Sequence, residues 1–154
     1  RIYALWKRKI FRPFVRMPLH DFRQRVGQRM YSFCQFATLT HPSFAEFAKI
    51  FYGHSRKRVP ETIADFLTPL ALAVWVMDDG TRNGNGLCLQ TNSFSTNEVR
   101  RLRKALWAKF RIETTMYRNK GKYIIYIPVR HMEHLQSIIC PHILPLFQYK
   151  VATP

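Results

Sequence analysis

The pattern of apolar and polar positions predicts helices and strands in a regular order from Pro69 onward. Residues 69–79, PLALAVWVMDD, are apolar almost throughout, and Thr68 and Pro69 suit the N-cap and the first helical position. Residues 87–93 alternate with the period of a strand, and residues 95–110 return to helical spacing. Gly80 is expected to end the first helix, and a turn, TRNGNG, precedes the strand.

The remaining sequence repeats this order. Residues 113–119 and 122–128 flank a basic turn as a second hairpin, and a short helix over residues 131–139 stops before Pro141. The order helix, hairpin, helix, hairpin, helix predicts an α+β domain, with a four-stranded antiparallel sheet covered on one face by helices. Cys88, Gln90 and Asn92 alternate with Leu87, Leu89 and Thr91, so we expect a polar, curved open face that fits a duplex groove.

The first part of the chain is less regular. Residues 1–29 hold nine basic residues and one acid, mixed with aromatic side chains, and two prolines argue against one long helix. Residues 31–39 are expected to form a strand. Residues 43–53 are expected to form a helix, with a Ser43–Glu46 capping box at its start.

Composition and charge limit the kinds of partner that the chain can bind. The 154 residues are 47% apolar and 14% aromatic, which indicates a folded chain. The formal net charge of +16, with basic side chains interleaved among Tyr, Phe and Asn, favours a nucleic-acid partner over a membrane surface. Three widely spaced cysteines without a CxxC pair indicate a reducing compartment, and a zinc site at the His and Cys residues of 131–142 matches no familiar spacing.

Asp78 and Asp79 stand at the end of the apolar helix, where the helix dipole disfavours them and each repels the other. In one interpretation, one carboxylate caps a turn while the other is solvated. In the other, a carboxylate beside the close-approaching Gly80 backbone supplies oxygen ligands to Mg²⁺.

The run LALAVWVMDDG resembles the signature helix of the LAGLIDADG homing endonucleases. The similarity continues in order through LCLQTNSFSTNEVRRLRKALWAKF, YIIYIP and CPHILPLFQYKV, covering about residues 31–151. It implies a saddle of αββαββα topology that binds nucleic acid. It also implies a basic N-terminal segment with the remnant of a first half over residues 1–54, and a second half over residues 55–154 with its signature helix at 69–79.

The resemblance assigns roles residue by residue. Asp79, directly before Gly80, matches the catalytic metal ligand, with Mg²⁺ as the cofactor. Lys150 and Lys57 resemble the basic active-site residues of the two halves, and Asn119 resembles a polar residue that supports the active-site water. Two small residues, Ala71 and Ala73, lie where paired signature helices pack closely.

Contacts to nucleic acid are expected from residues near the hairpins. Arg and Gln can read base edges, whereas Lys suits phosphates. The expected contacts are Arg82, Gln90, Asn92, Arg118, Lys120 and Lys122.

The implied activity is Mg²⁺-dependent, site-specific cleavage of double-stranded DNA, which in this family needs two acidic helices. One explanation places the first helix upstream of Arg1 or on another chain. A second is a nuclease-inactive RNA-binding protein, either an intron-splicing maturase or a component of an organellar ribosome. A homodimer is disfavoured because the N-terminal remnant would occupy the partner's place. Asp79, Lys57, Lys150 and Asn119 favour the nuclease, and the family's habitat implies an organelle, the mitochondrion ahead of the chloroplast.

Overall fold

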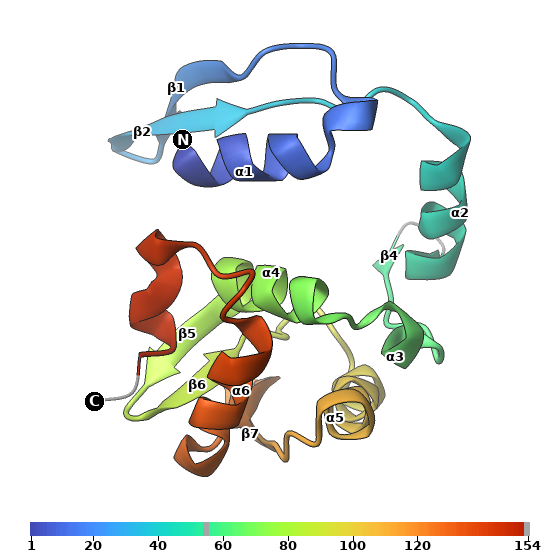
Figure 1. Ribbon diagram of the computed structural model, residues 1–154, viewed down its shortest axis with the longest axis vertical. Coiled ribbons are helices and arrows are strands. Elements are labelled where there is room, and N and C mark those ends of the chain that lie inside the picture. Colours follow the sequence, from blue (N-terminus) through green and yellow to red (C-terminus); the bar gives the residue numbers. More distant parts are fainter. Residues whose placement is uncertain (54–55, 153–154) are drawn as a thin grey trace. The chain divides into compact units, whose positions relative to one another are not determined.

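The computed structural model describes residues 1–53 and 56–152, which divide into two compact units, Arg1–Lys49 and Ile50–Pro154. The first unit opens with a helix and a short 3₁₀ turn, continues into a β-hairpin and ends within a second helix (Figure 1). These elements are α1 (Ile2–Ile10), η1 (Arg12–Phe14), β1 (His20–Val26), β2 (Arg29–Gln35) and α2 (Pro42–Phe51).

The hairpin of the first unit differs from the sequence expectation. The strand expected at residues 31–39 begins earlier, at Arg29, and pairs with a strand that was not expected, in the register Phe22↔Phe33. Strand β1 was missed because the face that holds Phe22 and Val26 also holds the polar His20 and Gln24, so no apolar alternation is visible. The Ser43–Glu46 capping box was also wrong. Helix α2 already includes Ser43, whose backbone N–H donates to Nδ1 of His41.

The second unit has the order of elements that the sequence predicted. Its short opening elements are β3 (Tyr52–Gly53), β4 (Arg56–Lys57) and α3 (Ile63–Phe66). The main elements are α4 (Pro69–Asp79), β5 (Gly80–Asn83), β6 (Gly86–Leu89), α5 (Thr96–Phe110), β7 (Thr115–Asn119), β8 (Lys122–Ile127), η2 (Val129–His131), α6 (Met132–Ile139) and η3 (Pro145–Lys150).

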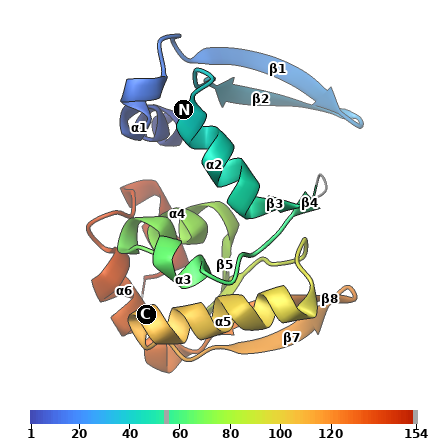
Figure 2. The ribbon, with the colours of Figure 1, turned by 90° about the vertical axis from the view of Figure 1, so that its right-hand side faces the viewer.

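Strands β5 to β8 form a four-stranded sheet in the order β5-β6-β8-β7, with each neighbouring pair antiparallel. Helix α5 lies along the part of the sheet that contains β7 and β8 (Figure 2), and α6 packs beside α4. This confirms the predicted α+β class. The fully buried core joins helix and sheet side chains, among them Leu72, Val76, Leu87, Leu89, Leu106, Ile125, Ile127 and Leu135.

Local signals in the sequence fix the helix starts. The hydroxyl of Thr68 accepts a hydrogen bond from the N–H of Ala71 at 3.1 Å, and Pro69 occupies the first turn of α4. Ser95 and Glu98 form the expected capping box of α5. None of the helices that the structure describes is long and apolar enough to cross a membrane.

Glu98 also joins α5 to the segment before α3. Its carboxylate accepts hydrogen bonds from the backbone N–H of Val59 at 3.1 Å and of Ser95 at 2.7 Å, and it forms an ion pair with Arg56 at 2.8 Å. Burial by itself raises the pKa of Glu98, but the hydrogen bonds from Ser95 and Val59 and the Arg56 charge lower that pKa overall. The carboxylate therefore stays ionised inside the fold.

The sheet face opposite the helices is less open than expected at one point. The expectation that Cys88 is a surface residue of this face was wrong, because only 3% of the residue is exposed. The hydroxyl of Tyr117 lies 3.0 Å from its Sγ atom, and the Asn83 amide lies 3.4 Å from the same sulfur. A tyrosine from another strand thus covers the thiol.

Candidate nucleic-acid interface and acidic helix end

Helix α4 delivers two adjacent carboxylates to the surface of the second unit. Asp78 and Asp79 are both exposed, whereas the residues just before them, Val76 and Met77, are buried. The carbonyl of Asp79 accepts a hydrogen bond from the N–H of Gln90 at 3.1 Å, so the end of the helix is tied to the end of β6. The position of the carboxylates is therefore set by both the helix and the sheet.

Gly80 makes the sharp change from helix to strand possible. Its N–H donates to the carbonyl of Val76, and its backbone leaves the helix in an extended conformation with φ −75° and ψ 136°. A Cβ atom added to Gly80 would lie 2.4 Å from the Val76 carbonyl oxygen. Glycine is required here because of this close approach, not because of an unusual φ.

Lys150 lies against the same helix end. Its Nζ donates to the carbonyl of Met77 at 2.7 Å and to that of Val76 at 3.3 Å, which places a cation at the negative end of the helix dipole. Only 8% of the residue is exposed, and its Nζ lies 5.3 Å from the centroid of the Phe147 ring. Lys150 of η3 thus offsets part of the cost of placing two carboxylates at a helix C-terminus.

Burial lowers the pKa of Lys150, and the negative charges of Asp78 and Asp79 oppose this shift. The two effects show that the ammonium and the carboxylates act on each other. Such a cluster, with a partly desolvated amine next to two acids, is common at functional sites.

A small depression of about 270 Å³ brings several of the expected site residues together. It contains Asp79 and Lys150, expected as catalytic, and Arg82 and Gln90, expected to contact nucleic acid. Asn92 joins this group, since its amide donates to the Gln90 side chain at 3.3 Å. The complete lining consists of Asp78, Asp79, Gly80, Thr81, Arg82, Gln90, Tyr149 and Lys150.

The other expected residues lie outside this lining. Lys57 is exposed on β4, where it pairs with Tyr52. Asn119 pairs with Lys122 at the end of the β7–β8 hairpin, and Lys120 occupies its turn with φ 50°. Lys57 and Asn119 therefore lie on elements that do not line the depression. Their shared role with Asp79 stays a prediction.

The strand register shows on which face of the sheet each expected contact residue lies. Opposed residues of antiparallel strands share a face, so Asn119 and Lys122 share the open face with Cys88. Arg82 is opposite Leu87, and Arg118 is opposite Tyr123, which places both on the other side.

Two arginines are held by local contacts. Arg82 donates to the carbonyls of Gly84, at 3.1 Å, and Ala152. The Arg118 guanidinium lies 5.4 Å from the centroid of the Tyr123 ring.

The residues expected to pack signature helices are both on α4. Ala73 is fully buried, whereas Ala71 is half-buried. Sequence reasoning missed Thr81 and Tyr149 as parts of the depression. Tyr149 directly precedes Lys150, so the neighbourhood of the basic residue was the signal that could have identified it.

A basic α+β unit with a sheet open on one face and an acidic helix end at its edge is typical of a nucleic-acid-binding class of protein. The sequence profile described as the LAGLIDADG DNA endonuclease family matches residues 1–135. The chain belongs to this family, which confirms the predicted family and the fold expected from it.

The relatives include proteins named for two activities. The chain is 40% identical over 119 residues to the cytochrome b mRNA maturase bI2 of Debaryomyces hansenii, covering 76% of this chain and 45% of the maturase. It is 38% identical over 120 residues to the intron-encoded endonuclease ai4 of Dictyostelium discoideum, covering 76% of each chain. The chain thus spans about half the length of the maturase.

A solved structure has the same fold. The homing endonuclease I-WcaI bound to its DNA recognition sequence matches with a TM-score of 0.94 and 25% identity, over 99% of this chain and 72% of that chain.

Proposed function

We propose that this chain contributes one acidic helix and one sheet of a site-specific, metal-dependent endonuclease that cuts double-stranded DNA. The observation that carries the proposal is the arrangement at the end of α4, where Asp78 and Asp79 are exposed beside the buried ammonium of Lys150. The DNA-bound homing endonuclease of similar fold supports the choice of substrate.

The residues fit a hard divalent cation such as Mg²⁺. Carboxylate oxygens are the ligands that Mg²⁺ prefers, and it usually keeps several water molecules when one or two carboxylates bind it. In this proposal Asp79 is the metal ligand, and Asp78 adds negative charge beside it. Bound Mg²⁺ would activate water and stabilise charge on the phosphate.

Lys150 has a separate role. Its ammonium is fixed by two backbone carbonyls, so it presents positive charge without a change in its position. A fixed cation stabilises the negative charge that develops on a phosphate during cleavage. Gln90 and Asn92, joined by their side chains, continue this polar region beyond the end of β6.

Cleavage of both strands would require a second acidic helix. Among the described residues, no group of three or more His, Cys, Asp or Glu could hold a metal ion. We propose that the second carboxylate comes from a segment or chain that adds another signature helix. Lys57 and Asn119 would act with that completed centre.

The polar end of the β7–β8 hairpin is the proposed place of DNA contact. Lys122 and Asn119 share the open face of the sheet, and Lys120 projects from the turn. Lys side chains suit phosphates, whereas the Gln90 and Asn92 amides can pair with base edges.

Cleavage of a randomised duplex DNA library in the presence of Mg²⁺ tests the proposal, with this chain joined to a segment that carries a second signature helix. The chain would be compared with Asp79→Asn, Asp78→Asn and the control Asp65→Asn, which removes an exposed carboxylate from α3. We expect sequence-specific cuts that Asp79→Asn abolishes, Asp78→Asn weakens and Asp65→Asn leaves unchanged. Salt-sensitive DNA binding with no cut by any of these proteins would contradict the nuclease.

A second function has support from one relative. The maturase of Debaryomyces hansenii is named for cytochrome b mRNA, so we propose RNA binding in intron splicing as the alternative. Its test is selective binding of structured intron RNA over duplex DNA of equal length, unaffected by Asp79→Asn. An organelle, with the mitochondrion favoured, is the proposed location in both cases.

A further inference from the structure

A basic groove lies on the helical side of the second unit, outside the acidic helix end. It encloses about 500 Å³ between α5 and the segment that follows it. Four cationic side chains and one carboxylate line it together with an indole ring. These residues are Arg100, Arg103, Lys104, Trp107, Glu113 and Arg130.

The groove is separate from the sheet face. Helix α5 buries Val99, Leu102 and Leu106 in the core, while Lys104 and Trp107 of the same helix are exposed. Helix α5 packs against β8 (Figure 2), and because its buried residues face the sheet, its exposed residues face away from it. A ligand in this groove would leave the open sheet face accessible.

Two of the cations are held in place. The Nε of Arg103 donates to the carbonyl of Thr114 at 3.1 Å and to its hydroxyl at 3.2 Å. Arg130 is paired with the Glu113 carboxylate at 2.8 Å, and this hydrogen bond lowers the pKa of Glu113. Fixed guanidinium groups lose less conformational entropy when they bind an anion.

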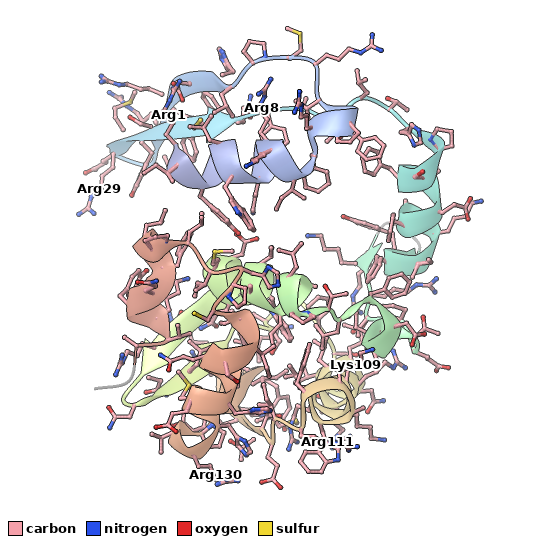
Figure 3. All side chains as sticks on the ribbon, viewed as in Figure 1. Arg1, Arg8, Arg29, Lys109, Arg111 and Arg130 are labelled. Atoms are coloured by element: carbon pink, nitrogen blue, oxygen red, sulfur yellow. The ribbon has the colours of Figure 1, made fainter. Side chains whose placement is uncertain are left out.

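Trp107 adds an aromatic surface to this positive groove. The residue is 46% exposed, which is unusual for a side chain that gains so much by burial. The guanidinium of Arg111 lies 5.4 Å from the centroid of its ring. Figure 3 shows Arg111 and Lys109 at the end of α5.

We propose that this groove binds a single-stranded segment of nucleic acid. Arg100, Arg103 and Lys104 would contact its phosphates, and one base would stack on Trp107. Basic grooves that follow the backbone, with aromatic rings as stacking platforms, are the usual means of binding single strands. A duplex keeps its bases stacked inside, and the carboxylate side chains of an acidic peptide carry no flat ring for the indole, so a single strand uses both features of the groove.

The test is binding of a fluorescein-labelled oligouridylate of about 12 nucleotides, within the range of single-strand sites. The 154-residue chain would be compared with three variants, Trp107→Ala, Trp107→Phe and Lys104→Gln. The control is Lys109→Gln, which removes an equal charge from an exposed position of the same helix outside the groove lining. Oligothymidylate and a duplex of equal length serve as parallel probes.

We expect Trp107→Ala to weaken binding of the oligouridylate roughly ten-fold, while Trp107→Phe retains most of the affinity because a ring remains for stacking. Lys104→Gln should reduce the slope of log K against log salt by about 0.7, the value for one phosphate contact on a single strand. Lys109→Gln should leave that slope unchanged. Tighter binding of oligouridylate than of oligothymidylate would show that the ligand is RNA. Equal binding would show that the groove recognises the phosphate backbone and stacked bases that RNA and DNA share.

The proposal would be overturned if Lys104→Gln and Lys109→Gln changed the slope equally, or if Trp107→Ala bound as tightly as the unchanged chain. Equal loss of duplex binding in Trp107→Ala would also overturn it. These outcomes are independent of Asp79 and of DNA cleavage, so failure of the nuclease proposal and failure of this one can be told apart.

Discussion

The ammonium of Lys150 donates a 2.7 Å hydrogen bond to the backbone carbonyl of Met77, the residue directly before the two carboxylates that end α4. A lysine at this point compensates the dipole of the helix and the charges of Asp78 and Asp79 together. The contact therefore has a structural role in the unit that does not depend on any nuclease activity. It also keeps a cation where a phosphate would approach.

The coupling of Lys150 to the acids can be measured by titration. Burial lowers the pKa of Lys150 and the two carboxylates raise it, so Asp79→Asn should lower that pKa further. An NMR titration of the Lys150 side chain would detect the shift, with Asp65→Asn as the control. An unchanged or higher pKa in Asp79→Asn would contradict the electrostatic contact.

The same shift has a consequence for stability. Because the pKa of Lys150 is lower in the folded state, the ammonium lowers stability at pH values below the folded pKa. This loss is recovered as the pH rises from the folded to the unfolded pKa. Lys150→Met removes this term, so its stability should lack the corresponding rise at alkaline pH, as measured by urea unfolding over a pH series.

Gly80→Ala should destabilise the second unit by about 1–3 kcal/mol, the usual range for overpacking. The new Cβ would lie 2.4 Å from the Val76 carbonyl oxygen, which already accepts the Gly80 N–H. Urea unfolding would measure the loss. Thr81→Ala changes the next, exposed residue and should stay within about 0.5 kcal/mol, so equal stabilities of the two variants would show that the helix end can move.

Local sequence signals were sufficient for most of the second unit. Thr68 and the Ser95–Glu98 pair mark helix starts through contacts within four residues, and the structure has both. The Lys150 contact joins residues 73 positions apart, so no local pattern could show it. Its place beside the acids followed from the family resemblance alone.

Where the sequence misled, a side chain from another element changed the environment. Cys88 has the strand position of an open-face residue, but Tyr117 from β7 covers it. In the first unit, β1 was missed because Arg23 and Arg25 stand at alternate positions of an otherwise irregular stretch. Charges on an exposed strand give the same pattern as a loop.

Glu98→Gln should lower the free energy of unfolding by about 1–3 kcal/mol at neutral pH, because a neutral amide cannot replace a carboxylate with these partners. Glu61→Gln is the matched control, since the Glu61 side chain is 89% exposed and forms only a 3.4 Å pair with Arg101. Chemical unfolding at several pH values would measure both.

The pH dependence distinguishes the role of the Glu98 charge. The folded state lowers the pKa of Glu98, so its stabilisation is present above the unfolded pKa and is lost as the pH falls through the folded pKa. The Glu98→Gln variant should therefore not show this loss of stability at acid pH. A loss of stability with the same acid dependence as the unchanged chain would assign the effect to packing.

The three cysteines provide a test of the cover over the sheet face. Cys140 is exposed, Cys34 is half-buried and Cys88 is buried beneath Tyr117, so a thiol reagent should modify them in that order. Tyr117→Ala removes the ring and should raise the modification rate of Cys88 severalfold, as followed by peptide mass spectrometry. Tyr117→Phe keeps the ring but removes the hydroxyl that lies 3.0 Å from the sulfur, so it should raise the rate less.

Since Cys140 reports any general loosening of the fold, its rate should stay constant in both variants. Equal reactivity of Cys88 and Cys140 in the unchanged chain would show that Tyr117 does not cover the thiol in solution.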